Sequence, residues 1–288
     1  MNKKVIIASD STTDLSPELI ARYQVEILPL YITLGGKQYR DGADIDPDFI
    51  YRHYEECGEL PKTSAPNIAE YTEFFQSYIS KQCAVVFFTI SSDMSSSYSN
   101  ACVAAQELSD VYVVDTQNLS TGGGLLVAAA GDLAAQGKSA EEIAEHCKAL
   151  AGRVDASFVV DKLEFLYKGG RCSAVAAVGA NVLRIKPCIV VRGGRMSVGR
   201  KYRGSFAAVL KKYIADQIKD AADIEPDRVF VTHAGCDEDL VRQCARQVKE
   251  LVPFREVLCT RAGCTVSSHC GRNTLGVLFI RKSPLKLS

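Results

Sequence analysis

The sequence predicts an α/β protein of two domains: an N-terminal doubly wound domain with a mostly parallel sheet, and a C-terminal α+β domain with a mixed sheet. In the first half, strand-like and helix-like segments alternate, which is typical of a doubly wound layer. The segment Ala84–Ile90 is continuously apolar, as a parallel strand buried on both faces requires. In the second half, hairpin signals such as Gly193-Gly194 interrupt this alternation. We expect domains at 1–155 and 156–288.

The elements of the first half follow from apolar runs and from helix-start residues. A strand at Lys3–Ser9 precedes a helix that Ser16 caps and Pro17 opens. Val25–Leu34 reads as one extended strand, which turns at Gly35-Gly36. The next helices are expected from Asp46-Pro47 to about Cys57, from Asn67 to about Ser80, and over Ser95–Leu108, Thr121–Gln136 and Ala140–Leu150. Val111–Val114 is the remaining strand.

The second half mixes hairpins with crossover helices. Lys168–Arg171 is predicted as a flexible turn because of its two glycines, and Thr265-Val266 looks like a strand. Strands are expected at Ser157–Val160, Ile189–Arg192, Arg195–Val198, Arg228–His233, Glu256–Thr260 and Leu275–Ile280. Helices are expected at Lys162–Tyr167, Ser205–Ala221 and Asp237–Leu251.

Composition narrows the class of protein. The chain has 288 residues, 34 acidic and 34 basic, so it has no overall field to gather nucleic acid or an anionic membrane. No stretch approaches the roughly 20 apolar residues of a membrane span, so stable membrane insertion is not expected. Eleven cysteines without a C-x-x-C pair fit a reducing compartment. We expect a cytoplasmic protein.

One cysteine-rich stretch offers a metal alternative. Cys259, Cys264, His269 and Cys270 could be drawn as a zinc site. Their spacing matches no compact zinc finger, so the sequence favours a protein without a metal or cofactor. A redox or metal protein stays open as an alternative.

Two polar turns are candidates for binding an anion. Thr63-Ser64-Ala65-Pro66 precedes a helix, where Ser and Thr commonly do no more than cap. In Ser91–Ser97, five serines fill seven positions between a buried strand and a helix start, more than a cap consumes. Hydroxyl groups and free helix amides together favour a carboxylate or phosphate.

Three further side chains could contact such an anion. His269 is expected in a loop bounded by Gly271, and Arg171 and Arg203 have glycine neighbours that allow a ligand to approach. The guanidinium fork suits a carboxylate. The alternative is a structural histidine and surface arginines.

Two other motifs are assigned structural roles. Thr121-Gly122-Gly123-Gly124 lacks the spacing of a phosphate loop, and close helix–sheet packing explains its glycines. Asp10 and Asp14 could suggest a metal, but Asp14 fits a helix start better.

In order, these motifs resemble the DegV family over essentially the whole chain. Ala8–Leu15 resembles the family's opening signature, Thr63-Ser64-Ala65-Pro66 its T-S-x-P, and Ser91–Tyr98 its S-S-x-L-S-G-T-Y. Val114-Asp115-Thr116, Leu166–Arg171 and His269-x-Gly271 complete the resemblance.

The resemblance implies a bacterial fatty-acid-binding protein of phospholipid metabolism, with no catalytic residue. Its ligand would be a long-chain fatty acid such as palmitate or stearate, lying between the two domains. The carboxylate would be held by Thr63, Ser95 and His269. Possible head-group or partner contacts are Ser64, Ser96, Arg171 and Arg203. Some members present the fatty acid to a separate fatty acid kinase, which is the partner expected here.

The sequence departs from the family pattern in two places. Ser96-Ser97 replace the usual Gly-Thr, a mild change, and Arg272-Asn273 replace the usual Pro-Gly beside the expected head group. The second departure bears on the kinase partnership more than on binding. The competing hypothesis is a serine-dependent acyl hydrolase or transferase, with Ser95 as nucleophile and His269 as base, although no G-x-S-x-G elbow is present.

Overall fold

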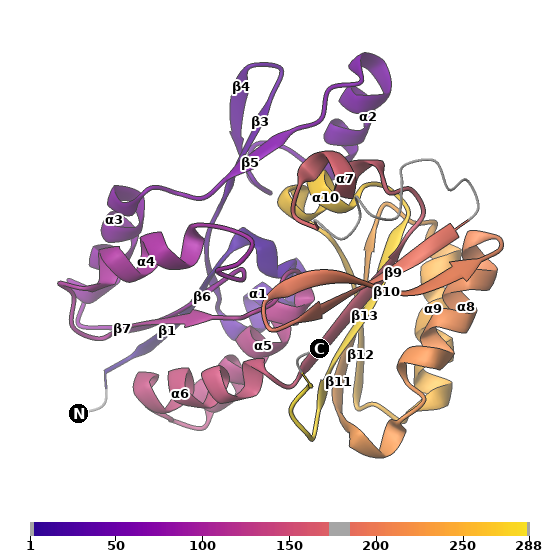
Figure 1. The fold of residues 1–288 in the computed structure, drawn as a ribbon. Helices are drawn as coiled ribbons and strands as arrows, with labels where there is room; N and C mark the ends of the chain where they lie inside the picture. Colours follow the sequence, from indigo (N-terminus) through magenta and orange to yellow (C-terminus); the bar gives the residue numbers. More distant parts are fainter. Residues whose placement is uncertain (1–2, 173–184, 287–288) are drawn as a thin grey trace.

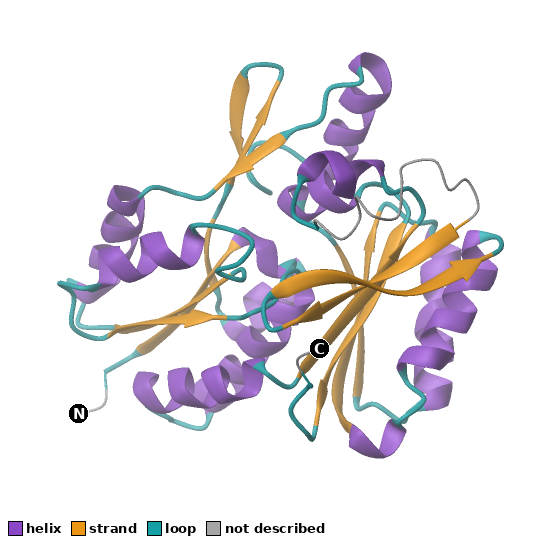
Figure 2. Cartoon of the chain, in the orientation of Figure 1, coloured by secondary structure: helices purple, strands orange, loops and turns teal. Residues whose placement is uncertain are grey.

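The computed structural model describes residues 3–172 and 185–286 and confirms the predicted fold class. A parallel sheet from the first part of the chain and a larger mixed sheet from the second part lie beside each other (Figures 1 and 2). Helix α5 (Thr121–Ala135) packs against strands of both sheets. No helix in the described part is long and apolar enough to cross a membrane.

The first sheet is a parallel layer with helices on both faces. Its strand order is β2-β1-β6-β7, with β1 at Val5–Asp10, β2 at Glu26–Leu28, β6 at Ala84–Thr89 and β7 at Val111–Asp115. Strand β6 is buried along its whole length, as its apolar sequence predicts. Around the sheet lie α1 (Pro17–Tyr23), α3 (Ile68–Ile79), α4 (Ser97–Ala105), α5 and α6 (Ala140–Ala151).

Alternate side chains of these strands build two separate cores. Phe87 packs with Tyr71 and Phe75 under α3, whereas Val86 and Phe88 face the core that contains α5 and α6. This period of two is what a strand covered on both faces requires.

The second sheet has six strands in the order β10-β9-β8-β13-β11-β12. Only β11 and β12 pair in parallel among its described pairs, so the sheet is mixed. Its strands are β8 (Val154–Val160), β9 (Ile185–Arg192), β10 (Arg195–Arg203), β11 (Ile224–Ala234), β12 (Glu256–Arg261) and β13 (Thr274–Arg281). Helices α8 (Phe206–Gln217) and α9 (Glu238–Leu251) cover the face turned away from α5 (Figure 1). Because β8 begins at Val154, the second sheet starts close to residue 155; the division into domains there stays a prediction.

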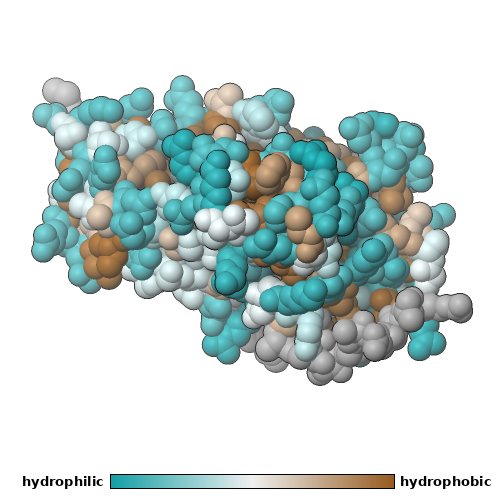
Figure 3. Space-filling view, turned by 90° about the horizontal axis from the view of Figure 1, so that it is seen from above, coloured by the Kyte–Doolittle hydropathy of each residue, from teal (hydrophilic) through white to brown (hydrophobic). Residues whose placement is uncertain are grey.

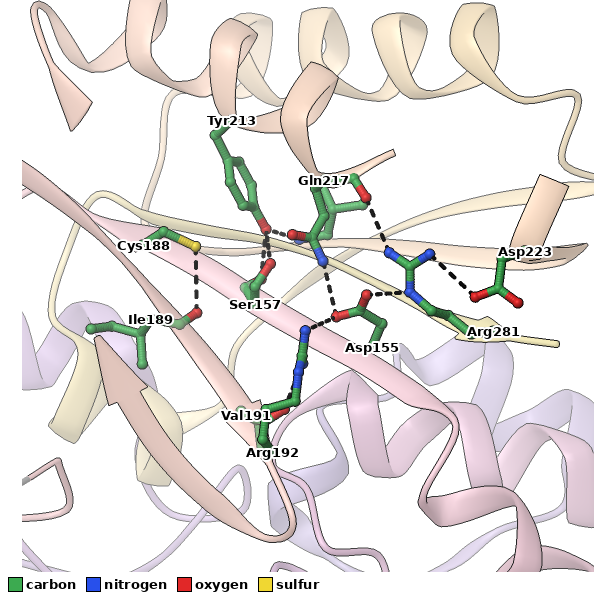
Figure 4. A network of polar contacts seen from close by, with 11 residues as sticks. Asp155, Ser157, Cys188, Ile189, Val191, Arg192, Tyr213, Gln217, Asp223 and Arg281 are labelled. Carbon is green, nitrogen blue, oxygen red and sulfur yellow. Dashed lines mark hydrogen bonds and ion pairs between the residues drawn. The ribbon is translucent and has the colours of Figure 1, made fainter. Parts of the chain in front are cut away.

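A buried polar network ties α8 to this sheet (Figure 4). Asp155 on β8 accepts hydrogen bonds from Arg192 at 2.9 Å, Arg281 at 2.6 Å and Gln217 at 3.0 Å. Nearby, the Tyr213 hydroxyl donates to the carbonyl oxygen of Ser157 at 2.7 Å. The buried carboxylate is thus matched by two guanidinium groups, as a buried charge requires.

A small antiparallel sheet with the order β4-β3-β5 projects above the gap between the two larger sheets (Figure 1). Its strands are β3 (Tyr31–Leu34), β4 (Lys37–Arg40) and β5 (Lys62–Ser64), and α2 (Pro47–Cys57) follows β4. Arg261 of β12 donates to both carboxylate oxygens of Asp48, at 2.9 and 2.6 Å, and so links α2 to the second sheet. Helix α2, which follows the small sheet in the chain, is thus tied to the second sheet.

The predicted single strand Val25–Leu34 is wrong, because the chain forms two strands in two sheets. Strand β2 pairs with β1, whereas β3 pairs with β4 and β5. Pro29 lies between β2 and β3 and has no amide hydrogen for a ladder. The chain changes sheets at this residue.

The expected strand at Thr265-Val266 and the expected loop around His269 are also wrong. Both lie in helix α10 (Cys264–Cys270), which packs against α7 (Glu164–Gly169). The carboxylate of Asp41 accepts hydrogen bonds from the amides of Cys264 at 2.8 Å and Thr265 at 3.1 Å. A residue distant in sequence thus satisfies the first turn of this helix.

Candidate functional site

A cavity of about 280 Å³ lies where the two parts of the chain meet. Six of the seven predicted contact residues line it: Thr63, Ser64, Ser95, Ser96, Arg171 and His269. The seventh, Arg203, is exposed at the end of β10 and does not line this cavity. Seen from above, the molecule shows apolar side chains in a recess between hydrophilic ones near the middle of this face (Figure 3).

Thr63 and His269 form the central polar contact of this cavity. Thr63 lies in β5, and its Oγ1 is 2.8 Å from Nε2 of His269, near the end of α10. Burial, and next the guanidinium of Arg171, lower the pKa of His269 to about 4. The imidazole is therefore neutral near pH 7, with one ring nitrogen as donor and the other as acceptor.

The second ring nitrogen of His269 faces the backbone at the end of α7. A Cβ atom on Gly169 would lie 2.5 Å from Nδ1, so only glycine fits against this ring. Nδ1 is buried and has no hydrogen-bond partner among the described residues. The carbonyl oxygen of Gly169 accepts a hydrogen bond from Arg171 at 3.0 Å, which holds the guanidinium beside the cavity.

Some hydroxyl groups of the serine cluster Ser91–Ser97 make structural hydrogen bonds, and others line the cavity. Ser91 donates to the carbonyl oxygen of Gly194 at 2.7 Å, and Ser92 donates to Asp115 at 2.6 Å. Ser95 Oγ accepts from the amide of Ser97 at 3.2 Å and also lines the cavity. The side chain of Ser96, before α4, makes no capping bond. Ser95 and Ser96 are thus the members of the cluster that line the cavity.

A smaller apolar cavity of about 30 Å³ adjoins the first one. The two share Leu119, Val266 and Cys270, and the smaller cavity extends between the start of α5 and the second sheet. Phe158 and Leu278 are among its walls. Polar groups therefore gather at one end of a space whose inner walls are apolar.

Sequence reasoning missed Thr265 and most of the apolar wall. Thr265 lines the larger cavity, and its buried Oγ1 has no partner in the part of the chain that the structure describes. Thr265 and His269 are four residues apart, which places them on one face of a helix. The four-residue spacing of Thr265 and His269 could have indicated a shared helix face, but the sequence analysis assigned Thr265 to a strand.

The geometry gives no support to the two competing hypotheses. Ser95 Oγ lies 2.9 Å from Ser97 Oγ, whereas Nε2 of His269 contacts Thr63, and no carboxylate orients Nδ1 within the described ranges. Among residues 3–172 and 185–286, no three His, Cys, Asp or Glu side chains are arranged to hold a metal ion. Cys264 instead contacts the carbonyl oxygen of Ile45 at 3.2 Å.

The departure at Arg272-Asn273 leaves the local backbone intact. Asn273 has a φ of 58°, the left-handed conformation that glycine adopts freely and asparagine tolerates best among other residues. Arg272 lies 3.4 Å from Glu55 and 5.2 Å above the ring of Tyr51, so it contacts α2.

The sequence as a whole matches a known family model. The model described as the DegV family covers residues 4–282. The chain belongs to the DegV family. It is 32% identical to a DegV domain-containing protein of Clostridium acetobutylicum over 282 residues, which cover 97% of this chain and 99% of the relative. A second relative, from Caldanaerobacter subterraneus, is 30% identical and is covered completely, with 97% of this chain.

Solved DegV structures share the whole fold. A DegV family protein from Thermus thermophilus, described as fatty-acid-binding, has a TM-score of 0.89 at 30% identity and covers 98% of this chain and 100% of its own. DegV of Bacillus subtilis, described as a fatty acid binding protein, has a TM-score of 0.84 at 26% identity with the same coverage. A stearic-acid-binding protein from Eubacterium ventriosum has a TM-score of 0.82 at 28% identity, covering 97% of this chain and 98% of its own.

Proposed function

We propose that this DegV protein binds a long-chain fatty acid without transforming it. The carboxylate would lie against Thr63, Ser95 and His269, and the acyl chain would extend into the apolar space beyond Leu119 and Val266. The observation that carries the proposal is the contact between Thr63 and His269 at the polar end of a cavity with apolar inner walls. The ligands of the Thermus and Eubacterium relatives support it.

The proposed head-group contacts suit a carboxylate. Hydroxyl groups and a neutral imidazole can donate hydrogen bonds to it, and the guanidinium of Arg171 supplies a positive charge at the exposed side. A carboxylate bound there could accept a hydrogen bond from the Thr265 hydroxyl, which is buried in the cavity wall and has no partner among the described residues.

The acyl chain would supply most of the affinity. Each buried methylene contributes about 0.8 kcal/mol, so fourteen would contribute roughly 11 kcal/mol before ordering costs. This is enough for a dissociation constant well below micromolar. Neither a cofactor nor a catalytic group is required.

Two measurements test fatty acid binding. Native mass spectrometry of the purified protein should find co-purified fatty acid, and delipidated protein should rebind palmitate or stearate. Thr63→Val combined with Ser95→Ala should weaken binding, because each lost hydrogen bond to a charged group costs about 1.5–3 kcal/mol. Thr72→Val is the matched control, since Thr72 donates to Ile68 within α3, away from the cavity. A delipidated protein without acyl affinity would contradict the proposal.

The finer proposal is that the protein presents its fatty acid to a separate fatty acid kinase in the cytoplasm. Ser64, Ser96 and Arg171 are exposed and line the polar end of the cavity, which leaves the carboxylate within reach of a partner. Arg203, exposed on β10 outside this lining, is assigned to partner contact.

The kinase proposal has its own assay. With ATP and a bacterial fatty acid kinase, the loaded protein should yield acyl phosphate. Arg203→Ala should slow this reaction and leave the affinity for fatty acid unchanged. A loaded protein whose bound fatty acid no such kinase converts to acyl phosphate would contradict the presenting role and leave binding intact.

A further inference from the structure

Asp14 is a buried carboxyl group outside the cavity that contacts two of its walls. It ends the short 3₁₀ helix η1 (Ser11–Thr13) and is 6% exposed. One carboxyl oxygen lies 2.5 Å from Oγ of Ser120, and the other accepts a hydrogen bond from the amide of Gly263 at 2.7 Å. It lines neither of the two adjoining cavities.

The two partners of Asp14 lead directly into different walls of the ligand space. Ser120 precedes α5 and lines the inner cavity, and its neighbour Leu119 lines both cavities. Gly263 precedes α10, which carries His269. One carboxyl group therefore joins the start of the α5 wall to the start of the α10 wall.

The backbone of Ser120 gives independent evidence that this junction is held in place. Its φ of 53° and ψ of −147° lie in a region that residues other than glycine rarely occupy. Such a conformation persists only where surrounding contacts impose it. The hydroxyl contact with Asp14 is the side-chain hydrogen bond that anchors Ser120.

We propose that Asp14 is a positioning residue for the ligand site: by holding Ser120 and Gly263 together, it sets the distance between the α5 and α10 walls and keeps His269 against Thr63. The proposal rests on the proposed binding of fatty acid at this cavity. The positioning role extends the proposed binding to Asp14, a residue that does not touch the ligand. From the sequence, Asp14 was assigned only a role at a helix start.

The protonation state of Asp14 fits this role. Burial raises its pKa to about 8, despite the hydrogen bonds from Ser120 and Gly263, and the carboxylates of Asp41 and Asp10 act in the same direction. The buried thiol of Cys270, on α10, is a further titratable group near it. Near pH 7 the carboxyl group is therefore largely neutral. The ionised form accepts from both the Ser120 hydroxyl and the Gly263 amide. In the neutral form the Ser120 hydroxyl turns to accept from the carboxyl O–H, while the other oxygen still accepts from Gly263.

An asparagine can imitate this neutral form. Its oxygen can accept from the Gly263 amide, and its NH₂ group can donate to the Ser120 hydroxyl. Asp14→Ala removes both contacts. The pair of variants therefore separates loss of the two hydrogen bonds, in Asp14→Ala, from loss of an ionisable group alone, in Asp14→Asn.

The test measures palmitate affinity and the pKa of His269 by NMR in the full-length protein. In Asp14→Ala, we expect palmitate affinity to fall about tenfold or more, since an unpaired buried donor is left on each wall. The pKa of His269 should rise from about 4 towards its ordinary value as water reaches the displaced ring. Asp14→Asn should stay within about threefold of the wild-type affinity at pH 7.

Two more variants keep the test decisive. Ser120→Ala removes one contact and should weaken palmitate binding by about threefold to tenfold. If Asp14→Ala does not fold, Ser120→Ala tests the positioning role in its place. Val248 is a buried residue of α9 that lines neither cavity, so Val248→Ala lowers stability without touching either wall. Wild-type affinity in Ser120→Ala, or an equal loss in Val248→Ala, would overturn the positioning role. A wild-type protein that binds no palmitate would instead contradict the proposed function, and the His269 pKa would still test the positioning role.

Discussion

Nε2 of His269 lies 2.8 Å from Oγ1 of Thr63, although 206 positions separate the two residues in the chain. The contact joins β5 of the small sheet to α10 beside the second sheet. It spans the polar end of the cavity, so any movement between the two elements changes the hydrogen bonds available to a bound carboxylate.

Gly169→Ala should disturb this contact from the far side of the ring. The added Cβ would lie 2.5 Å from Nδ1 of His269, so the imidazole must move away from α7. We expect stability to fall by about 1–3 kcal/mol, as for other overpacked sites, and fatty acid affinity to fall with it. Gly152→Ala is the matched control, because its Cβ would meet no atom within 4 Å. Calorimetric titration and thermal unfolding of both variants give the comparison; equal behaviour would contradict the steric argument.

The buried imidazole should make the protein less stable in acid. The pKa of His269 is about 4 in the folded protein and near its ordinary value of 6.5 when unfolded, so the unfolded chain binds more protons between these values. The contribution is fully present above pH 6.5 and is lost as the pH falls towards 4. The slope reaches at most about 1.4 kcal/mol per pH unit. Denaturant unfolding of wild type and His269→Asn from pH 4.5 to 7 measures the difference, and parallel curves would argue against a depressed pKa.

Asp14 should act in the opposite sense. Its pKa is about 8 in the folded protein and near its ordinary value of 3.8 when unfolded, so the folded state binds more protons between these values. Stability from this group is full below pH 3.8 and declines as the pH rises through 8. Burial raises the pKa of Asp10 to about 6, so the stability contribution of Asp10 declines over a narrower pH range. Asp14→Asn should therefore gain stability relative to wild type between pH 6 and 8, as measured by denaturant unfolding. A constant difference over that range would refute the assignment.

Asn273 should accept glycine readily and alanine poorly. Its φ of 58° costs little for glycine but about 1–2 kcal/mol for a residue with an ordinary Cβ. Asn273→Gly should change the free energy of unfolding by less than about 1 kcal/mol, whereas Asn273→Ala should lower it by about 1 kcal/mol. Thermal unfolding distinguishes them, and the reverse ranking would contradict the left-handed backbone.

Local signals in the sequence predicted the elements that local contacts define. Ser16 caps α1 and Pro17 opens it, as expected. Asn67 and Glu70 form a reciprocal capping box at the start of α3. The apolar run at β6 correctly predicted a strand buried on both faces. In each case the determining atoms lie within a few residues of the element.

Elements defined by distant residues could not be predicted in this way. The first amides of α10 bind Asp41 and its preceding glycine binds Asp14, both more than 220 positions away. Viewed alone, the β-branched pair Thr265-Val266 favours a strand. The helix forms because tertiary contacts satisfy its first turn.

The site was predictable in its polar part only. Hydroxyl-rich turns and the family resemblance pointed to Thr63, Ser95 and His269, which line one cavity. Its apolar wall joins Leu119, before α5, to Met196 of β10, and neither residue carries a local sign of that role. Such walls follow from how the two sheets are placed.

The distribution of thiols makes the opening of this cavity measurable. Cys57 and Cys259 are exposed, whereas Cys270 is buried in the wall shared by both cavities, and burial raises its pKa to about 12. A thiol-alkylating reagent should therefore modify the two surface cysteines at once and reach Cys270 only when the surrounding wall opens enough to expose its thiol. The rate at which Cys270 is alkylated therefore measures how often the cavity opens. Mass spectrometry can follow this rate without any label on the lipid.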